Sequence, residues 1–595
     1  MTDAVFSLPG AHLMLAPILL PILTAALMLV AGEKRPGTKV AMNIASTAIG
    51  LVVAVVLLLR VDRSGATGVY LAGNWPTPFG IALALDRLSA LMLVLAQVVG
   101  LTTAVFSAAR WHRAGVHFPP LFQLQMTGLA GAFLTADLFN LFVFFEILLA
   151  ASYGLLLHGS GRARVQASLH YIAINLGASF LFLVGVALIY GVTGTLNLAD
   201  IARRIPAVAA ADRGLLHAGA AILAIAFLAK AAIWPLNFWL VRGYAAATPP
   251  VAGLFAIMSK VGLYALLRLW TLFFPASASE SAFFGGSALV GAGMATLVFG
   301  TVGLLASQRM ANLAGYALIV SSGTVLAALG FGQPTVTAGA LYYLVSSTLA
   351  ASAFLMLGDL VERWRNGGAI SAPHDRAGDA PFLAADLEPI HGIDLDERDD
   401  IQPTGRTIPA AAVFLGLAFG GCALVIAGLP PLSGFTAKFA LLSGLLNPLG
   451  MDRGITDVAG LPGVSNTPGA PQWTLLALLI ASGLAGLLAF GRVGIRHFWS
   501  AQVRSVPTLR WVECLPIAAL LAGCVLLTVF GGAVLGYAQA TATALHQPQG
   551  YIRAVLGERP VPSPSSTSPR PPDTGPQEGN DDPARAAERR EATTP

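Results

Sequence analysis

The chain has 595 residues, of which 55 % are hydrophobic and only 11 % are charged, and its mean hydropathy is +0.72. Apolar runs of about 18 or more residues recur from end to end, which excludes a soluble globular protein and indicates a polytopic membrane protein. The formal charge of +5 does not indicate a nucleic-acid partner, because the basic residues lie mostly in short loops between the apolar runs.

The apolar runs predict an all-α membrane fold of about fourteen transmembrane helices in the lipid bilayer. The first lacks the basic start and the small-residue cleavage site of a signal peptide, so we expect it to remain as a membrane helix. The expected limits are 11–32, 39–60, 81–109, 119–136, 138–158, 166–192, 215–241, 248–274, 282–306, 311–332, 335–361, 408–447, 473–499 and 513–537.

Basic residues alternate along these spans. Those in loops after odd-numbered spans are Lys34, Arg35, Lys39, Arg110, Arg113, Arg162, Arg164, Arg242, Arg309, Arg363, Arg365, Arg504 and Arg510. Loops after even-numbered spans are poorer, with Arg203, Arg204 and Arg213 as the main exception. By the positive-inside rule, the odd loops face the cytoplasm and both termini lie on the other side of the membrane.

One carboxylate, Glu146, lies inside the apolar run 138–157. A charge at the bilayer centre costs about 2.5 to 3.5 kcal/mol on insertion scales, so an acid that remains there is expected to be paired or used. Lys230, Lys260 and Lys438 lie in comparable apolar surroundings. We expect an ion pair between Glu146 and Lys230, with the other two lysines continuing the row, because a buried lysine can lose its proton and an arginine cannot. The row predicts a proton relay.

Hydroxyl side chains lie between the last two lysines, on the tenth and eleventh expected spans. They are Ser321, Ser322, Thr324, Tyr342, Tyr343, Ser346, Ser347 and Thr348. They can hold a water path for protons, but Ser and Thr commonly bond to their own helix, so both alternatives stay open. Asp137 is expected to cap the fifth span, with a role in proton uptake or release as the alternative.

Two expected spans carry proline breaks. Pro235 follows the lysine of the seventh span by five residues, and Pro430, Pro431 and Gly434 precede the lysine of the twelfth. Proline removes a backbone donor and clashes with the preceding turn, and in lipid the freed carbonyls must be satisfied by protein or water. Both helices are therefore expected to be broken around a hydrated interior.

Interrupted helices at matching places in two halves are typical of transporters built from internal repeats. The expected parts are residues 1–110 with the first three helices, 119–274 and 282–499 as two inverted five-helix repeats, and 513–537 as the last helix. The acidic segment 362–407 is expected to be a solvated loop, or alternatively a docking surface for a partner subunit. The polar tail, 557–595, is expected to be disordered.

No dinucleotide fingerprint, phosphate loop, cysteine cluster or haem-type histidine pair occurs in the sequence. We therefore expect no cofactor and no bound metal.

Four motifs then indicate a family. They are DLFNLFVFFEILLAASYGLL, AFLAKAAIWPLNFWL, TPPVAGLFAIMSKVGLYALLRL and AGLPPLSGFTAKFALLSGLL. In this order they resemble the proton-translocating, antiporter-like membrane subunits shared by respiratory complex I and the multisubunit Mrp-type cation/proton antiporters. The resemblance covers residues from about 10 to 540. The form WPLNFWLV and the acidic segment make it most similar to the D subunits of the Mrp type, in particular those of the potassium/proton (Pha) branch.

The resemblance implies that Glu146 and Lys230 form the family's essential ion pair, that Lys260 is its central relay lysine and that Lys438 is its distal lysine. It implies a subunit of a bacterial inner-membrane complex that works with sibling antiporter subunits. In such a membrane the basic loops predict that both termini lie on the periplasmic side. Such a subunit is a secondary transporter rather than an enzyme, and it couples proton movement to export of Na⁺ or K⁺.

The chain departs from its complex I relatives at positions where they carry histidines. It reads Arg242-Gly243-Tyr244 after the seventh span, and serines at 321, 322 and 346. A proton wire here is therefore expected to rely on water and hydroxyls.

Two other functions stay open: a proton-pumping subunit of a redox complex of the complex I or membrane-bound hydrogenase type, and an assembly scaffold with structural charges. Ferredoxin-like cysteine motifs in neighbouring genes would favour the redox pump.

Overall fold

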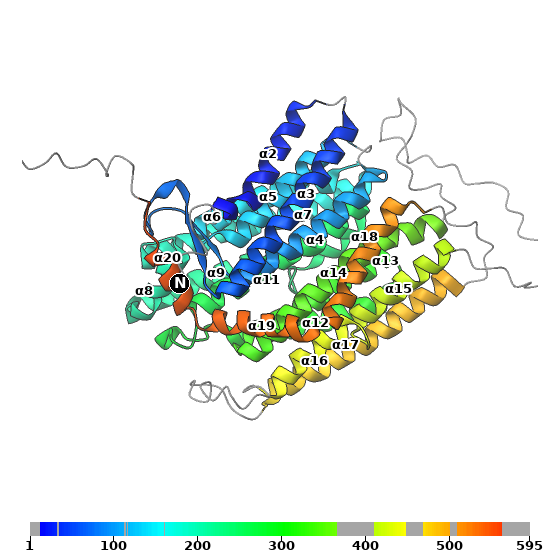
Figure 1. Cartoon of the computed structure of the whole chain (residues 1–595). Coiled ribbons are helices and arrows are strands. Elements are labelled where there is room, and N and C mark those ends of the chain that lie inside the picture. Colours follow the sequence, from blue (N-terminus) through cyan, green and yellow to red (C-terminus); the bar gives the residue numbers. More distant parts are fainter. Residues whose placement is uncertain are drawn as a thin grey trace, which may run out of the picture. The chain divides into compact units, whose positions relative to one another are not determined.

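The computed structural model describes residues 12–32, 35–111, 115, 117–159, 161–365, 410–447, 468–499 and 509–561. Those as far as Glu558 form a helical bundle within one compact unit (Figure 1). Among them, thirteen helices are long and apolar enough to span a membrane, and α5, with 17 residues, is just shorter than the others. The prediction of an α-helical, multi-pass membrane protein is confirmed.

The helices in chain order are α2 (Ala16–Val30), α3 (Pro36–Ser64), α4 (Arg87–Ala108), α5 (Phe118–Leu134), α6 (Leu138–Leu157), α7 (Arg162–Thr193), α8 (Leu198–Arg204), α9 (Ala210–Lys230), α10 (Phe238–Ala246), α11 (Pro249–Phe273), α12 (Gly286–Ala306), α13 (Met310–Gly330), α14 (Pro334–Arg365), α15 (Ala410–Ala427), α16 (Ser433–Leu446), α17 (Ala470–Gly494), α18 (Trp511–Val529), α19 (Gly531–His546) and α20 (Gln549–Gly557).

Helix α11 lies at the centre of the bundle, and its most apolar stretch is completely buried. It packs against α4, α9, α13 and α14. The spans predicted around Pro235 and around Pro430 are each broken in two, as expected, into α9 with α10 and α15 with α16. The break segments, residues 231–237 and 428–432, each lie next to a buried lysine.

A small antiparallel sheet joins α3 to α4, which an all-α prediction misses. Strand β1 (Gly68–Leu71) pairs with β2 (Ala82–Leu85), with Gly68 opposite Leu85 and Leu71 opposite Ala82. Each strand has only four residues, so the alternation of side chains is too short to stand out beside long apolar helices.

The predicted limits of the last membrane helix, 513–537, are wrong. Helix α18 ends at Val529, and α19 begins at Gly531 after Phe530 has left the helical conformation. Two successive glycines, Gly531 and Gly532, weaken the helix at this point. Helix α19 packs on α14 and α11, and α20 packs on α8, so this C-terminal segment connects distant parts of the bundle (Figure 1).

Two predicted segments lie largely outside the described residues. The acidic segment 362–407 begins inside α14, and its residues 366–407 are not among those that the structure describes. The same holds for residues 562–595 of the predicted tail 557–595.

A buried ion pair joins α4 to α11. Asp86 caps α4 by accepting a hydrogen bond from the Ser89 backbone N–H at 2.9 Å, and it accepts two more from Arg268 Nη1 and Nη2 at 2.5 and 2.6 Å. Burial by itself raises the pKa of Asp86, but the Arg268 guanidinium outweighs it and holds that pKa below its ordinary value. Tyr551 of α20 covers the guanidinium at 5.3 Å. The pair therefore fixes three helices at this end of the bundle.

We expect Asp86→Ala to lower the thermal unfolding temperature of the detergent-purified protein markedly. It would leave Arg268, which is 6 % exposed, without its carboxylate, and breaking a buried pair on one side costs about 3 kcal/mol or more. The matched control is Asp62→Ala, because the Asp62 carboxylate is 49 % exposed in its pair with Arg87 and such pairs contribute about 1 kcal/mol or less. Equal unfolding temperatures for the two variants would contradict a structural role for the buried pair.

Candidate functional site: a row of buried charges

The first part of the site joins α6, α7 and α9. The Ser179 hydroxyl donates to Glu146 Oε1 at 2.5 Å and accepts from Lys230 Nζ at 3.3 Å. The predicted ion pair between Glu146 and Lys230 is therefore not a direct contact, because one hydroxyl stands between the two groups. That hydroxyl is donor to the carboxylate and acceptor from the ammonium, which is the arrangement through which a proton can pass from the lysine to the acid.

At the break after Lys230, side chains form hydrogen bonds with the backbone groups. The carbonyl of Ala229, at the end of α9, accepts from Trp239 Nε1 at 3.1 Å as well as from the Ala232 N–H at 3.2 Å, and the Trp234 N–H donates to Thr296 Oγ1 at 3.0 Å. Lys230 Nζ also lies 5.2 Å from the centroid of the Phe145 ring, within the range of a cation–π contact. The helix interruption at Pro235 thus persists without unpaired backbone groups at these two positions.

The second part surrounds Lys260, in the middle of α11, whose side chain is completely buried. Its Nζ donates to Ser321 Oγ at 2.9 Å and to Ser322 Oγ at 3.3 Å, both on α13. Ser321 Oγ lies 2.8 Å from Ser347 Oγ on α14. Two of the predicted hydroxyls therefore bind the lysine directly, and a third extends the chain of hydrogen bonds to the next helix.

The third part surrounds Lys438, on α16. Its Nζ donates at 2.8 Å to the carbonyl of Ala427, the last residue of α15, which the helix break leaves without an intrahelical donor. Gly428 follows in the left-handed region with φ of +78°, and a Cβ there would lie 2.5 Å from Lys438 Cδ. Gly434 is equally constrained, since a Cβ there would overlap the Val425 carbonyl oxygen.

A small cavity lies between the second and third parts. Its volume is about 10 Å³, which is about the smallest space that can hold one water molecule. Among its lining residues are Tyr343, Ser346 and Ser347 of α14, Val425 near the end of α15, and Ser482 and Gly486 of α17. Ser346 Oγ also lies 2.8 Å from Ser433 Oγ, at the start of α16. Hydroxyls thus reach from the Lys260 group towards the helix that carries Lys438.

Other predicted hydroxyls point elsewhere. Thr324 and Thr348 donate to carbonyls of their own helices, Val320 and Leu344, at 2.9 and 2.6 Å. Tyr342 donates to the Leu527 carbonyl of α18 at 2.6 Å. The structure keeps Thr348 and Tyr342 out of the hydrogen-bond chain around Lys260, whereas the Tyr343 hydroxyl hydrogen-bonds with both Thr324 and Ser321 and so joins that chain.

Asp137 is the N-cap of α6 and accepts from the Asn140 N–H at 2.8 Å, as expected for a cap. Burial raises the pKa of its carboxyl. It lies nine residues before Glu146 on the same helix, about 13 Å away along the axis. Asp137 is therefore separate from the row of charges.

Sequence reasoning misses two features. Ser179 is an isolated serine in an apolar run, with no signal to distinguish it until three helices are placed together. The second feature is an ion cluster: Glu513, 1 % exposed, lies 2.8 Å from Arg363 and 3.1 Å from Arg110, and joins the ends of α4, α14 and α18. From the sequence alone, both arginines indicate only membrane topology. An acid at the start of an apolar run, such as Glu513, is the signal that could have indicated a buried ion pair.

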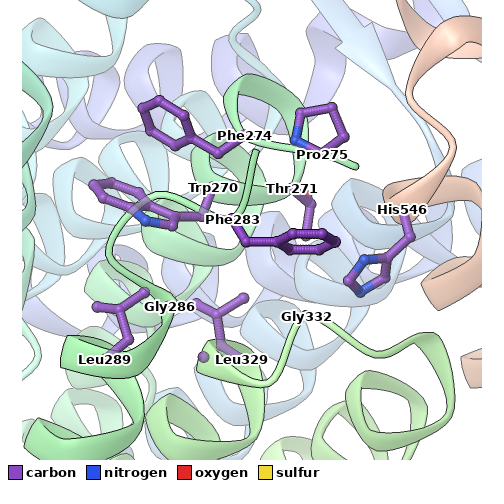
Figure 2. Close-up of a pocket in the computed structure, with 11 residues that line it drawn as sticks. Trp270, Thr271, Phe274, Pro275, Phe283, Gly286, Leu289, Leu329, Gly332 and His546 are labelled. Carbon is purple, nitrogen blue, oxygen red and sulfur yellow. The ribbon is translucent and has the colours of Figure 1, made fainter. Parts of the chain in front are cut away.

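A separate pocket at the Asp86 end of the bundle is not part of this row. Figure 2 shows Trp270, Phe274 and Phe283 around it, with His546 at one side. Its volume is about 30 Å³, room for about one water. His546 Nε2 lies 2.9 Å from Thr337 Oγ1, and burial lowers the pKa of this ring to about 4, so it is neutral near pH 7. The pocket is small, aromatic and uncharged.

Known proteins are similar to this chain over almost its whole length. Residues 135–376 match the family described as NADH:quinone oxidoreductase/Mrp antiporter, TM. The chain is 50 % identical to the D subunit of a probable K(+)/H(+) antiporter of Rhizobium meliloti (strain 1021), covering 92 % of this chain and 97 % of the relative. It is 30 % identical to the D subunit of the Na(+)/H(+) antiporter of Alkalihalophilus pseudofirmus, covering 92 % of this chain and 100 % of that relative.

The fold is also found in a solved structure. A chain in the structure of the Mrp complex from Dietzia sp. DQ12-45-1b superposes with a TM-score of 0.74 at 24 % identity, covering 93 % of this chain and 100 % of that one. Together with the sequence relatives, this likeness extends well beyond the 135–376 segment, to the second helix break and Lys438. The chain belongs to the family of NADH:quinone oxidoreductase/Mrp antiporter membrane subunits, in the group of antiporter D subunits.

Proposed function

We propose that this chain is the proton-translocating subunit of a multisubunit Na⁺/H⁺ or K⁺/H⁺ antiporter of a bacterial inner membrane. The observation that carries the proposal is the row of three buried lysines, each 7 % exposed or less, whose ammonium groups bind hydroxyls or a freed carbonyl. The names of the two relatives, D subunits of K(+)/H(+) and Na(+)/H(+) antiporters, support the coupling to a monovalent cation. Sibling antiporter subunits complete the machine.

The Glu146 end of the row supports a concrete proton step. Lys230 gives a proton to the Ser179 oxygen while Ser179 gives its own proton to Glu146, so the lysine becomes neutral and the acid becomes protonated. The total charge does not change, but both charges disappear. In the low dielectric of the bundle this alters the potential at Lys260 more than it would in water, which couples one site to the next.

The two helix breaks, each beside a buried lysine, support a division into two inverted five-helix repeats, 119–274 and 282–499. In this arrangement Lys230 and Lys438 hold equivalent places and Lys260 lies between them. The basic loops support a topology with both termini on the periplasmic side.

The first test uses everted vesicles from an antiporter-deficient bacterium that expresses this chain with its neighbouring subunits. After acidification of the lumen, addition of Na⁺ or K⁺ should cause recovery of a pH-sensitive dye. Glu146→Ala should reduce the recovery by about a hundredfold or more without preventing assembly, because the acid end of the relay is lost and Lys230 can become neutral by losing its proton.

The control is Glu280→Ala, because Glu280 is 75 % exposed and, within the part of the chain that the structure describes, pairs with Arg213 alone. It should leave transport unchanged. Proton pumping that needs a reductant, with no response to either cation, would move the chain to the redox pumps. Loss of the assembled complex in Glu146→Ala would show that the carboxylate is structural.

Replacement of Ser179 tests the bridge. We expect Ser179→Ala to slow transport by roughly tenfold, because no hydroxyl then joins Glu146 to Lys230, and Ser179→Thr to restore most of it. Ser168→Ala is a matched control on the same helix, since the Ser168 hydroxyl is buried and has no hydrogen-bond partner among the described residues. Normal transport in Ser179→Ala would show that protons do not use this hydroxyl.

Gly428 tests the site at the second break. Gly428→Ala adds a Cβ 2.5 Å from Lys438 Cδ at a position with φ of +78°, so the lysine side chain must leave the Ala427 carbonyl. We expect strongly reduced transport with normal complex abundance on a membrane immunoblot. Gly420→Ala, in the interior of α15 with open space around it, should have little effect. Equal transport by both variants would remove Lys438 from the path.

A further inference from the structure

A groove of about 940 Å³ lies outside the charge row, between α7, α10, α12 and α13. Its volume is near the upper end of ligand pockets in proteins, which run from about 300 to 1,000 Å³. Helix α10 packs on both α7 and α13, so the second half of the broken helix forms one wall. The side chains of Leu169 and Phe238 are 62 % and 51 % exposed, so the groove opens to the outside of the bundle.

The ionisable side chains that line the groove are all of the basic type. They are His170 of α7, Arg242 of α10 and Arg309 at the start of α13, with no Asp or Glu among the lining residues. Arg242 makes no ion pair and no hydrogen bond with any described residue. Among the same residues, the Arg309 side chain hydrogen-bonds only to the neutral Asn312, at 3.5 Å. An anion, rather than Na⁺ or K⁺, therefore fits this groove.

The side-chain amide of Asn237 is a second, independent indication that the groove binds a molecule with a hydrogen-bond acceptor. Asn237 lines the groove, is 3 % exposed, and its side-chain Nδ2 has no hydrogen-bond partner among the described residues. It stands at the N-cap of α10 but makes no capping hydrogen bond there. A buried donor left unpaired costs about 1 to 3 kcal/mol, so an oxygen atom in the groove would relieve this cost.

The charges and the apolar residues are separated by depth. Helix α12 ends at Ala306 and α13 begins at Met310, so Arg309 lies in the short connection between two helices that are long and apolar enough to span a membrane. Phe299, also lining the groove, is seven residues before the end of α12, about 10 Å deeper. A basic rim above an apolar wall matches the shape of a phospholipid, with its phosphate at the surface and its chains below.

We propose that this groove binds an anionic phospholipid, whose phosphate is held by Arg242 and Arg309 and whose acyl chain lies along Leu169, Phe238 and Phe299. Arginine binds phosphate through paired hydrogen bonds, and basic pockets between membrane helices are typical sites for anionic headgroups. The lipid holds α10, and thus the second half of the broken helix, against α7 and α13.

The test counts bound lipids by native mass spectrometry on the full chain, purified with its sibling subunits in mild detergent. We expect anionic phospholipid on the parent and roughly tenfold weaker retention in the double variant Arg242→Gln, Arg309→Gln. Arg35→Gln is the control, because Arg35 is an exposed arginine at the start of α3 that does not line the groove. Equal retention by the double variant and the parent would overturn the proposal.

A second measurement does not depend on the variants folding. The delipidated parent should gain thermal stability when phosphatidylglycerol or cardiolipin is added back, and much less with phosphatidylcholine. Equal gains with both kinds of lipid would overturn the proposal. So would a cross-link from Leu169→Cys to a sibling subunit in the assembled complex, because the groove would then be a protein interface. Neither readout depends on transport.

Discussion

The structure depends on how the protein satisfies two kinds of buried hydrogen-bonding group, the ammonium groups of its lysines and the backbone groups at its helix breaks. A lysine in a bilayer needs acceptors, and a helix that stops in a bilayer leaves carbonyls without donors. At the second break these needs meet, because Lys438 donates at 2.8 Å to the last carbonyl of α15. At the first break the Ala229 carbonyl accepts from Trp239 and not from the lysine, and Lys230 donates to Ser179, which in turn donates to Glu146. The two breaks are therefore alike in place and different in chemistry.

Serine is well suited to be the partner of these lysines. A hydroxyl accepts from an ammonium and donates to a neutral amine by rotating about one bond, so both protonation states of the lysine stay hydrogen-bonded. Lys260, with Ser321 and Ser322, has this environment on a completely buried side chain. A carboxylate in direct contact would hold the lysine charged, and an apolar wall would hold it neutral. A hydroxyl can hydrogen-bond to either state of the lysine, as the proposed relay would require.

The sequence predicted those features that the bilayer dictates. Long apolar runs identified the spans, and Pro235, Pro430 and Pro431 identified the breaks, because hydrocarbon makes length and backbone donors decisive. The hydroxyl contacts were less predictable. Whether Ser347 meets Ser321 while Thr348 bonds to its own helix depends on the rotation of α14, which composition does not encode. Ser179 and the break at Phe530 were missed for related reasons: one needs three helices in place, and the other needs the packing of α19 on α14.

The two ends of the bundle are held by different means. At one end, the pair of Asp86 and Arg268 ties α4 and α11 together under Tyr551, with both charges paired. At the other, α10 has only nine residues, too few for a helix to be stable alone in water, and it carries Arg242 without a carboxylate partner in the described chain. A helix this short takes its position from its neighbours. Since α10 follows directly on the break after Lys230, the proposed lipid in the groove beside it would also act on the geometry of that break.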